Sequence, residues 1–227
     1  DAGADGVEFD VQLAKDGVPV VIHDAALRRT AGRTDNVADL TSTELGTTDA
    51  GSWFNRRYPR GARTEFEHET VPTLEEVLAL HENQTGPIYI ELKCDETNYK
   101  PLASVVCDMI RNSPLLPRMI VKSFRLGAVA EVRCLLPVVQ TAALFEPSIL
   151  TILRRRRYII AMAREFGADQ ISLHKSLAMP KLAKLASDAG MPVTVWTADD
   201  PKWIERCRNR GIGALITNDP AAMLVHR

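Results

Sequence analysis

The stretch GVEFDVQLAKDGVPVVIHD, residues 6–24, decides the fold class of this chain. Apolar and polar residues alternate over 7–13, which predicts a strand with one buried face. A second apolar arm follows over 18–22, directly after Asp16 and Gly17. Because an Asp-Gly pair is typical of a two-residue hairpin turn, we expect the two arms to pair in antiparallel orientation.

The predicted hairpin brings a histidine next to an acid. If Asp16 and Gly17 form the loop, Asp10 on the first arm lies directly opposite His23 at the end of the second. Directly opposed side chains have Cβ atoms about 4.5–5.5 Å apart. We therefore expect His23 to lie beside Asp10.

Strands and helices alternate along the rest of the chain. Strands separated by single helices are typical of a parallel sheet, because parallel neighbours require a crossover connection. Setting the second hairpin arm aside leaves seven parallel strands. An eighth strand before Asp1 would close a TIM (β/α)8 barrel, so we expect this α/β fold with its first strand absent from the sequence. The later strands are expected over 88–93, 119–123, 138–144, 170–173, 193–197 and 214–217, and the helices over 73–80, 101–111, 126–134, 152–166, 180–189, 201–210 and 220–225.

Composition excludes several classes of function. The chain has 227 residues, 45% of them apolar, and its formal net charge is −1, so it carries no long-range field to attract nucleic acid. No apolar run approaches the roughly 18 residues that span a bilayer, which argues against stable membrane insertion. The four cysteines lack a CxxC or framework spacing, which favours a reducing, cytoplasmic location. The polar segment 24–71 is predicted to be a lobe inserted within a single barrel domain that covers 1–227.

Acidic residues gather on the strands predicted to be neighbours. Glu8 and Asp10 share one face of the first strand, and Glu91 and Lys93 share one face of a later strand. Because the ends of barrel strands converge on one mouth, we expect the three carboxylates to meet there. Oxygen-only ligands suit Mg²⁺ or Ca²⁺, although solvated acids on an exposed edge would show the same pattern.

Histidine is the default residue for proton transfer near neutral pH, and His23 has the most suggestive setting. It would lie beside the proposed cation site, whereas a lone histidine at a strand end is more often structural. His174, at the end of another predicted strand, is a second residue that could line the barrel mouth.

The chain resembles the glycerophosphodiester phosphodiesterase family in the order and spacing of six segments, between Gly3 and Pro220. The resemblance implies a TIM barrel, one divalent cation, and hydrolysis of glycerophosphodiesters to glycerol 3-phosphate and an alcohol in lipid and glycerol metabolism. The segments are GADGVEFDVQLAKDGVPVVIHD, VPTLEEVL, IYIELK, VKSF, VTVWT and GIGALITNDP.

The resemblance also implies roles for individual residues. By position, Glu8, Asp10 and Glu91 would hold the metal, and His23 would be a catalytic histidine. Members of the family also carry a His-Arg-Gly strand at their start, with a first catalytic histidine, which this sequence does not contain. The residues that would bind substrate are Lys93 on the phosphate, Trp196 on the glycerol moiety and Phe124 in the same pocket.

Three other functions remain open from the sequence. The chain could be a related phospholipase-type phosphodiesterase, or a truncated, non-catalytic relative that binds a phosphodiester or a metal. A basic run at 154–157 could contact nucleic acid or phosphate, although a solvated helix start explains it better, since no aromatic residues are interspersed. The sequence does not indicate the oligomeric state or the alcohol half of the substrate.

Overall fold

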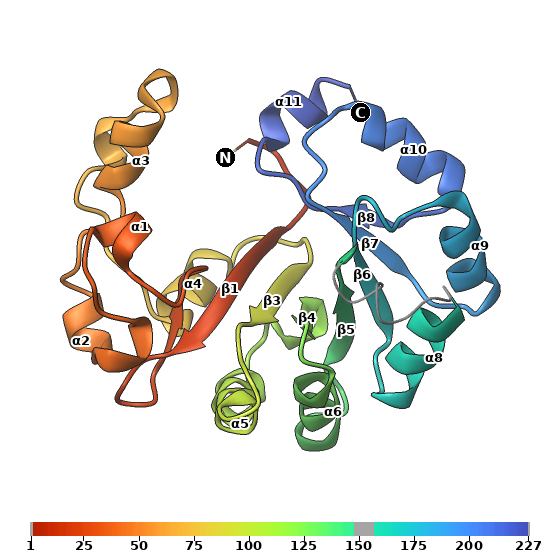
Figure 1. The fold of residues 1–227 in the computed structure, drawn as a ribbon, viewed down its shortest axis with the longest axis horizontal. Coiled ribbons are helices and arrows are strands. Elements are labelled where there is room, and N and C mark those ends of the chain that lie inside the picture. Colours follow the sequence, from red (N-terminus) through yellow and green to blue (C-terminus); the bar gives the residue numbers. More distant parts are fainter. Residues whose placement is uncertain (1, 148–156, 227) are drawn as a thin grey trace.

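A curled sheet of eight strands forms the centre of the described part of the chain, residues 2–147 and 157–226 of a computed structural model (Figure 1). The strand order is β2-β1-β3-β4-β5-β6-β7-β8. Among the described strands, only β2 runs antiparallel to its neighbour; the other seven are parallel to one another. The strands are β1 (Val7–Leu13), β2 (Pro19–Val21), β3 (Ile88–Leu92), β4 (Met119–Ser123), β5 (Gln140–Phe145), β6 (Gln170–His174), β7 (Val193–Trp196) and β8 (Ala214–Leu215).

The parallel strands confirm the predicted barrel-type α/β fold. β1 and β8 end the parallel set, and within the described residues they are not paired with each other, so this part of the barrel is open. The expected eighth parallel strand concerns residues before Asp1 and stays a prediction. The run at 154–156 lies outside the described residues, and the described helix begins at Arg157.

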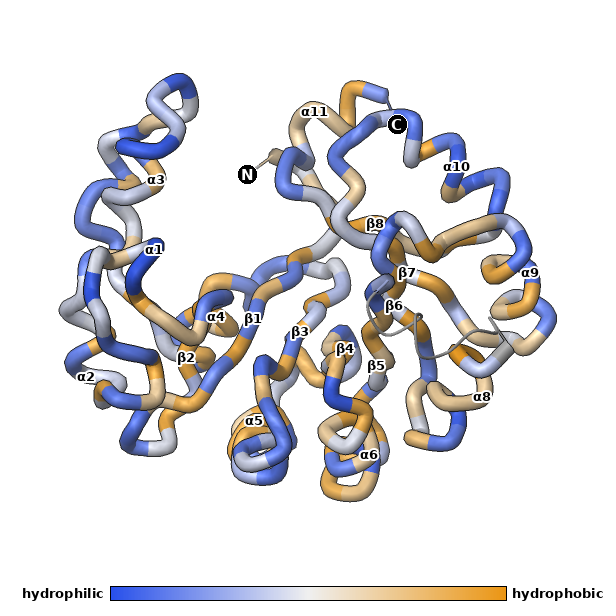
Figure 2. Tube along the Cα trace, viewed as in Figure 1, coloured by the Kyte–Doolittle hydropathy of each residue, from blue (hydrophilic) through white to orange (hydrophobic). Residues whose placement is uncertain are grey.

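Helices cover the outer face of the sheet, and side chains fill its inner face. Figure 2 shows hydrophobic residues along β7 and on α5 and α6, whereas α3 and α10 are mostly hydrophilic. On the inner face Tyr89, Ile120 and Ala142 pack together, and the Tyr89 hydroxyl lies 3.2 Å from Thr194 Oγ1 across the barrel. The helices are α1 (Arg28–Ala31), α2 (Ser42–Leu45), α3 (Ser52–Arg57), α4 (Leu74–Leu80), α5 (Tyr99–Ile110), α6 (Leu126–Leu135), α8 (Arg157–Glu165), α9 (Pro180–Asp188), α10 (Lys202–Arg210) and α11 (Pro220–Leu224).

The hairpin forms, but its predicted register is wrong by one residue. Its loop holds three residues, 15–17, and Gly17 adopts a left-handed φ of 79°. Such a loop pairs a type I turn with a glycine bulge, a geometry that an Asp-Gly sequence also allows. Asp10 therefore lies opposite Ile22, whose backbone N–H donates to the Asp10 carbonyl at 2.9 Å, and not opposite His23. The ladder pairs are Val11–Val21, Gln12–Val20 and Leu13–Pro19.

The segment after β2 builds a separate group of short helices. α1, α2 and α3 lie to one side of β1 in Figure 1, away from the helices that cover the parallel strands. The helix predicted from residue 73 forms as α4, which a capping box of Thr73 and Glu76 begins, and the chain then returns to the sheet. This segment packs around its own apolar cluster, made of Ala14, Val20, Ile22, Leu27, Val37, Leu40, Leu45 and Val71.

Candidate active site

The sheet register brings the predicted acids together. Asp10 on β1 is paired with Glu91 on β3, and Glu91 is paired with Lys122 on β4, so three neighbouring strands carry charge side by side. Glu8 projects from the same face of β1, two residues earlier. One carboxylate oxygen from each of Glu8, Asp10 and Glu91 lies within 4.8 Å of the others.

Two lysines lie among these carboxylates. Lys93 Nζ lies 3.2 Å from Asp10 Oδ1 and 2.5 Å from Glu91 Oε1. Lys122 Nζ lies 2.8 Å from Glu8 Oε1 and 3.8 Å from Glu91 Oε2. Within the described part of the chain, two ammonium groups face three carboxylates, so the cluster holds one more acid than base.

Burial shapes the ionisation of the cluster. It raises the pKa of the Glu91 carboxyl above its ordinary value, although Lys93 and Lys122 oppose this shift. Burial alone would lower the pKa of Lys93, but the Glu91 and Asp10 carboxylates outweigh it and raise that pKa. Lys93 therefore remains a cation between two acids.

The residues of the cluster fit a divalent cation. All three candidate ligands are carboxylates, and hard cations such as Mg²⁺ and Ca²⁺ prefer oxygen ligands. The Lys93 ammonium already lies between Asp10 and Glu91, which shows that positive charge is favoured at this point. A divalent cation held by the three acids would compete with Lys93 for the same two carboxylates.

We expect Lys122→Met to make the stability of the protein depend on a divalent cation. Lys122 is only 2% exposed, and its removal leaves the partly buried Glu8 carboxylate without its charge partner. Breaking a buried ion pair costs about 3–5 kcal/mol, and we expect about 2–3 kcal/mol here because Glu8 is partly exposed.

Urea unfolding in EDTA and in excess Mg²⁺ measures this effect. The loss should appear in EDTA and shrink with Mg²⁺, because the cation then compensates Glu8. Lys100→Met, at an exposed position on α5, is the matched control and should leave both curves unchanged. Equal destabilisation with and without Mg²⁺ would show that Glu8 does not contact the cation.

His23 lies two residues after the end of β2, and its backbone carbonyl is hydrogen-bonded to the side chain of Gln12 on β1. Gln12 Nε2 donates to the carbonyls of Ile22 and His23, both at 3.0 Å, which links the start of this loop to the strand that carries Asp10. The His23 side chain is 63% exposed, and its carboxylate partner among the described residues is Asp24, at 2.7 Å. The imidazole therefore lies near β1 without touching the acidic cluster.

Asp24 is held in its charged form. Arg29 donates to Asp24 Oδ2 at 2.5 Å, and this hydrogen bond lowers the pKa of Asp24 to about 2, although partial burial opposes the shift. The carboxylate consequently stays ionised at any working pH of the protein. It can orient the His23 ring through the 2.7 Å contact with Nδ1.

Aromatic side chains form a wall on the other side of the cluster. Phe124 follows β4 and Trp196 ends β7, and their ring centroids lie 5.4 Å apart in an edge-to-face contact. His174 ends β6, 5.3 Å from the Trp196 ring, as expected for a residue of the barrel mouth. Lys93 Nζ lies 5.7 Å from the Phe124 ring, which connects this wall to the acids.

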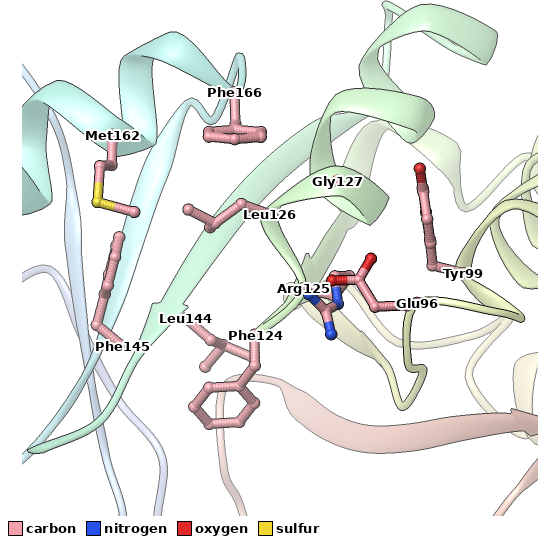
Figure 3. Close-up of a pocket in the computed structure, with 10 residues that line it drawn as sticks. All are labelled: Glu96, Tyr99, Phe124, Arg125, Leu126, Gly127, Leu144, Phe145, Met162 and Phe166. Atoms are coloured by element: carbon pink, nitrogen blue, oxygen red, sulfur yellow. Dashed lines mark hydrogen bonds and ion pairs between the residues drawn. The ribbon is translucent and has the colours of Figure 1, made fainter. Parts of the chain in front are cut away.

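Phe124 also borders a cavity of about 370 Å³ (Figure 3). In Figure 3, Phe145, Met162 and Phe166 form an apolar side of this cavity. The opposite side is polar, where Arg125 Nη1 lies 2.5 Å from Glu96 Oε1. The structure thus places Phe124 and Trp196, the two aromatic residues predicted to bind substrate, in one wall. It also shows a neighbouring cavity that the sequence did not indicate.

Sequence reasoning missed two residues of this site and underused a third. Gln12 continues the alternation of Glu8 and Asp10, so that pattern could have identified it. Lys122 interrupts the apolar run of β4, and a charge in the middle of a buried strand is itself a signal. The role of Asp24 depends on its contact with Arg29, five residues later, and no periodic pattern in the loop predicts that contact.

Comparison with protein families gives a match over almost the whole chain. The model described as the glycerophosphoryl diester phosphodiesterase family matches residues 1–222. A glycerophosphodiester phosphodiesterase from Caldanaerobacter subterraneus subsp. tengcongensis is 29% identical over 224 residues, which cover 98% of this chain and 85% of that protein. A glycerophosphodiester phosphodiesterase from Bacillus altitudinis is 38% identical over 144 residues, 63% of this chain and 56% of that protein.

Solved structures share the fold. A phosphodiesterase from Oleispira antarctica, solved with the product sn-glycerol-3-phosphate, matches with a TM-score of 0.83 at 23% identity, covering 99% of this chain and 85% of that one. A glycerophosphodiester phosphodiesterase from Agrobacterium tumefaciens matches with a TM-score of 0.77 at 24% identity, covering 99% of this chain and 88% of that one.

Proposed function

Because the chain belongs to the glycerophosphoryl diester phosphodiesterase family, we propose that its acidic cluster is the centre of a metal-dependent hydrolysis of glycerophosphodiesters. The chain is a phosphoric diester hydrolase, and the products are glycerol 3-phosphate and an alcohol. The observation that carries the proposal is the approach of Glu8, Asp10 and Glu91 to within 4.8 Å on neighbouring strands.

The three carboxylates would hold one divalent cation, Mg²⁺ or Ca²⁺. When bound, such a cation polarises a phosphoryl oxygen and offsets the negative charge of the diester. Lys122 neutralises Glu8 from the inner side of the cluster and keeps that carboxylate in place. The protein thus supplies charge compensation on both sides of the cation site.

Lys93 would neutralise the substrate phosphate. Its ammonium lies between the acids and the Phe124 ring, so it faces both the cluster and the aromatic wall. An ammonium placed beside developing charge stabilises a transition state electrostatically. Phe124 and Trp196 would pack against the glycerol half of the substrate, and the product bound to the Oleispira antarctica relative, sn-glycerol-3-phosphate, has the expected chemistry.

His23 would transfer a proton at the reacting phosphate. Asp24, charged and 2.7 Å from the imidazole, would orient the ring for proton transfer. His23 is exposed and lies where the lobe begins, two residues after β2, and it would contact a substrate that lies over the acids. The reaction needs both a base and an acid, and His23 would supply one of the two.

The proposal also covers domain organisation, location and binding partner. We propose a single barrel domain over 1–227 with the segment 24–71 as its inserted lobe. Cys94, Cys107, Cys134 and Cys207 are free thiols, which supports a reducing, cytoplasmic compartment. The binding partner of the protein would be a small glycerophosphodiester and not a nucleic acid. Within the described residues, no helix is long and apolar enough to cross a membrane.

Removing the cation should stop the reaction. We expect EDTA to lower the release of glycerol 3-phosphate from glycerophosphocholine by at least about a hundredfold, because a bound cation contributes several kcal/mol to the barrier. Adding back Mg²⁺ or Ca²⁺ in separate assays of the full-length gene product should restore the rate and identify the preferred cation. A rate that EDTA leaves unchanged would contradict the metal centre.

A further inference from the structure

A basic hollow of about 440 Å³ lies in the lobe, separate from the acidic cluster. It lies between α1 and α3, whose residues line it, and we call it the arginine hollow. Its charged and aromatic lining residues are Arg28, Arg29, Trp53, Arg56, Arg57 and Tyr58.

Most of the positive charge in the arginine hollow has no acidic partner. Arg29 is paired with Asp24, but within the described ranges Arg28, Arg56 and Arg57 form no ion pair with a carboxylate. Like charges that line one hollow repel one another unless an anion joins them. A guanidinium presents a planar fork of donors that matches a phosphate, so a phosphate group is the ligand that this lining suits best.

Aromatic rings orient part of this lining. The Arg29 guanidinium carbon lies 4.6 Å from the centroid of the Trp53 ring, and that of Arg57 lies 5.4 Å from the Tyr58 ring. Trp53 and Tyr58 meet edge to face, with centroids 6.2 Å apart. Stacked guanidinium groups lose less side-chain freedom when they bind an anion, so the hollow is partly ordered in advance.

The arginine hollow is connected to the proposed site of reaction. Arg29 donates to Asp24 at 2.5 Å, and Asp24 lies 2.7 Å from the His23 imidazole. In the sheet order, β1 and β3 carry the acids, the aromatic wall lies on β4, β6 and β7, and the lobe leaves the sheet after β2 on the other side (Figure 1). If the glycerol half packs on the aromatic wall, the alcohol half points towards the lobe.

We propose that the arginine hollow binds a phosphate group carried by the alcohol half of the substrate. The enzyme would then favour glycerophosphodiesters whose leaving alcohol is itself phosphorylated. This inference rests on the proposed function. The reaction is unchanged: water replaces the alcohol at the diester phosphorus, and the released alcohol keeps its own phosphate.

A matched pair of substrates tests the proposal. Glycerophosphoglycerol and glycerophosphoglycerol phosphate differ only by the extra phosphate on the alcohol half. We expect kcat/KM to be at least about tenfold higher for the phosphorylated diester. This factor corresponds to the lower end of the energy of a hydrogen bond between charged groups, because the arginines are exposed. The double variant Arg56→Gln/Arg57→Gln should lose this preference and keep its rate on glycerophosphoglycerol. Arg60→Gln, in the same lobe but outside the hollow, should behave as the unchanged protein.

Equilibrium binding separates this inference from the proposed function. In EDTA, where the proposed metal dependence would prevent turnover, the unchanged protein should still bind the phosphorylated diester about tenfold more tightly than glycerophosphoglycerol, and the double variant should bind both equally. Equal affinity of the unchanged protein for the two diesters would overturn the arginine hollow as a subsite, even where hydrolysis proceeds. Tighter binding without any hydrolysis of either diester would instead contradict the proposed function alone.

Discussion

Glu91→Gln should lower kcat/KM for glycerophosphodiester hydrolysis by about a thousandfold or more. Glu91 is the buried acid of the cluster, and both lysines contact it, at 2.5 and 3.8 Å. An amide keeps the size of the side chain but removes the charge that would bind the cation. Losing several kcal/mol of electrostatic stabilisation corresponds to about three orders of magnitude in rate.

The fold should survive this change. Without the Glu91 charge, Lys93 is still paired with Asp10 at 3.2 Å, and Lys122 is still paired with Glu8 at 2.8 Å. Each ammonium therefore retains one acidic partner. Calorimetric titration with Mg²⁺ and with Ca²⁺ should show weaker binding, while the urea midpoint in EDTA should change little. Glu75→Gln, at an exposed position of α4, is the matched control and should alter neither. Full activity of Glu91→Gln would remove Glu91 from the reaction.

The acidic cluster could be predicted because side chains in a β-strand alternate between its two faces with a period of two residues. Once the strands were identified, alternation placed Glu8 and Asp10 on one face and gave Glu91 the matching face of β3. β1 and β3 are neighbours, and their register pairs Asp10 with Glu91. Lys122 occupies the matching face of β4, and its charge in the middle of a buried strand is the signal that marks it as part of the same cluster.

The setting of His23 could not be predicted, because it depends on one residue in a loop. Asp16-Gly17 suits both a two-residue turn and a three-residue loop with Gly17 in the left-handed region, and these two loops differ by one position of register. Residues 15–17 form the longer loop, so Ile22, and not His23, lies opposite Asp10. The side-chain partners of His23 come from the lobe, where no periodic pattern indicates contacts.

His23→Asn should lower kcat by about 10²–10⁴-fold and leave KM and cation affinity nearly unchanged, as expected for loss of a proton-transfer group. The His23 side chain is exposed and, among the described contacts, pairs with Asp24 and not with the three acids. The cation site therefore does not depend on it. His68→Asn is a closely matched control, because His68 is also exposed in the lobe and also lies beside an aspartate, Asp49, at 3.6 Å. Its left-handed φ of 63° is one that asparagine tolerates.

A comparison of two leaving groups distinguishes the two roles that His23 could have, general acid or general base. If His23 protonates the departing alkoxide, a p-nitrophenyl ester of glycerol 3-phosphate should be hydrolysed by His23→Asn almost as fast as by the unchanged protein, because this group departs without a proton. If His23 instead deprotonates the nucleophile, both substrates should slow by the same factor. Rates on both substrates that equal those of His68→Asn would show that proton transfer does not pass through His23. The lobe would then contribute only to substrate binding, through the residues that surround Asp24 and Arg29.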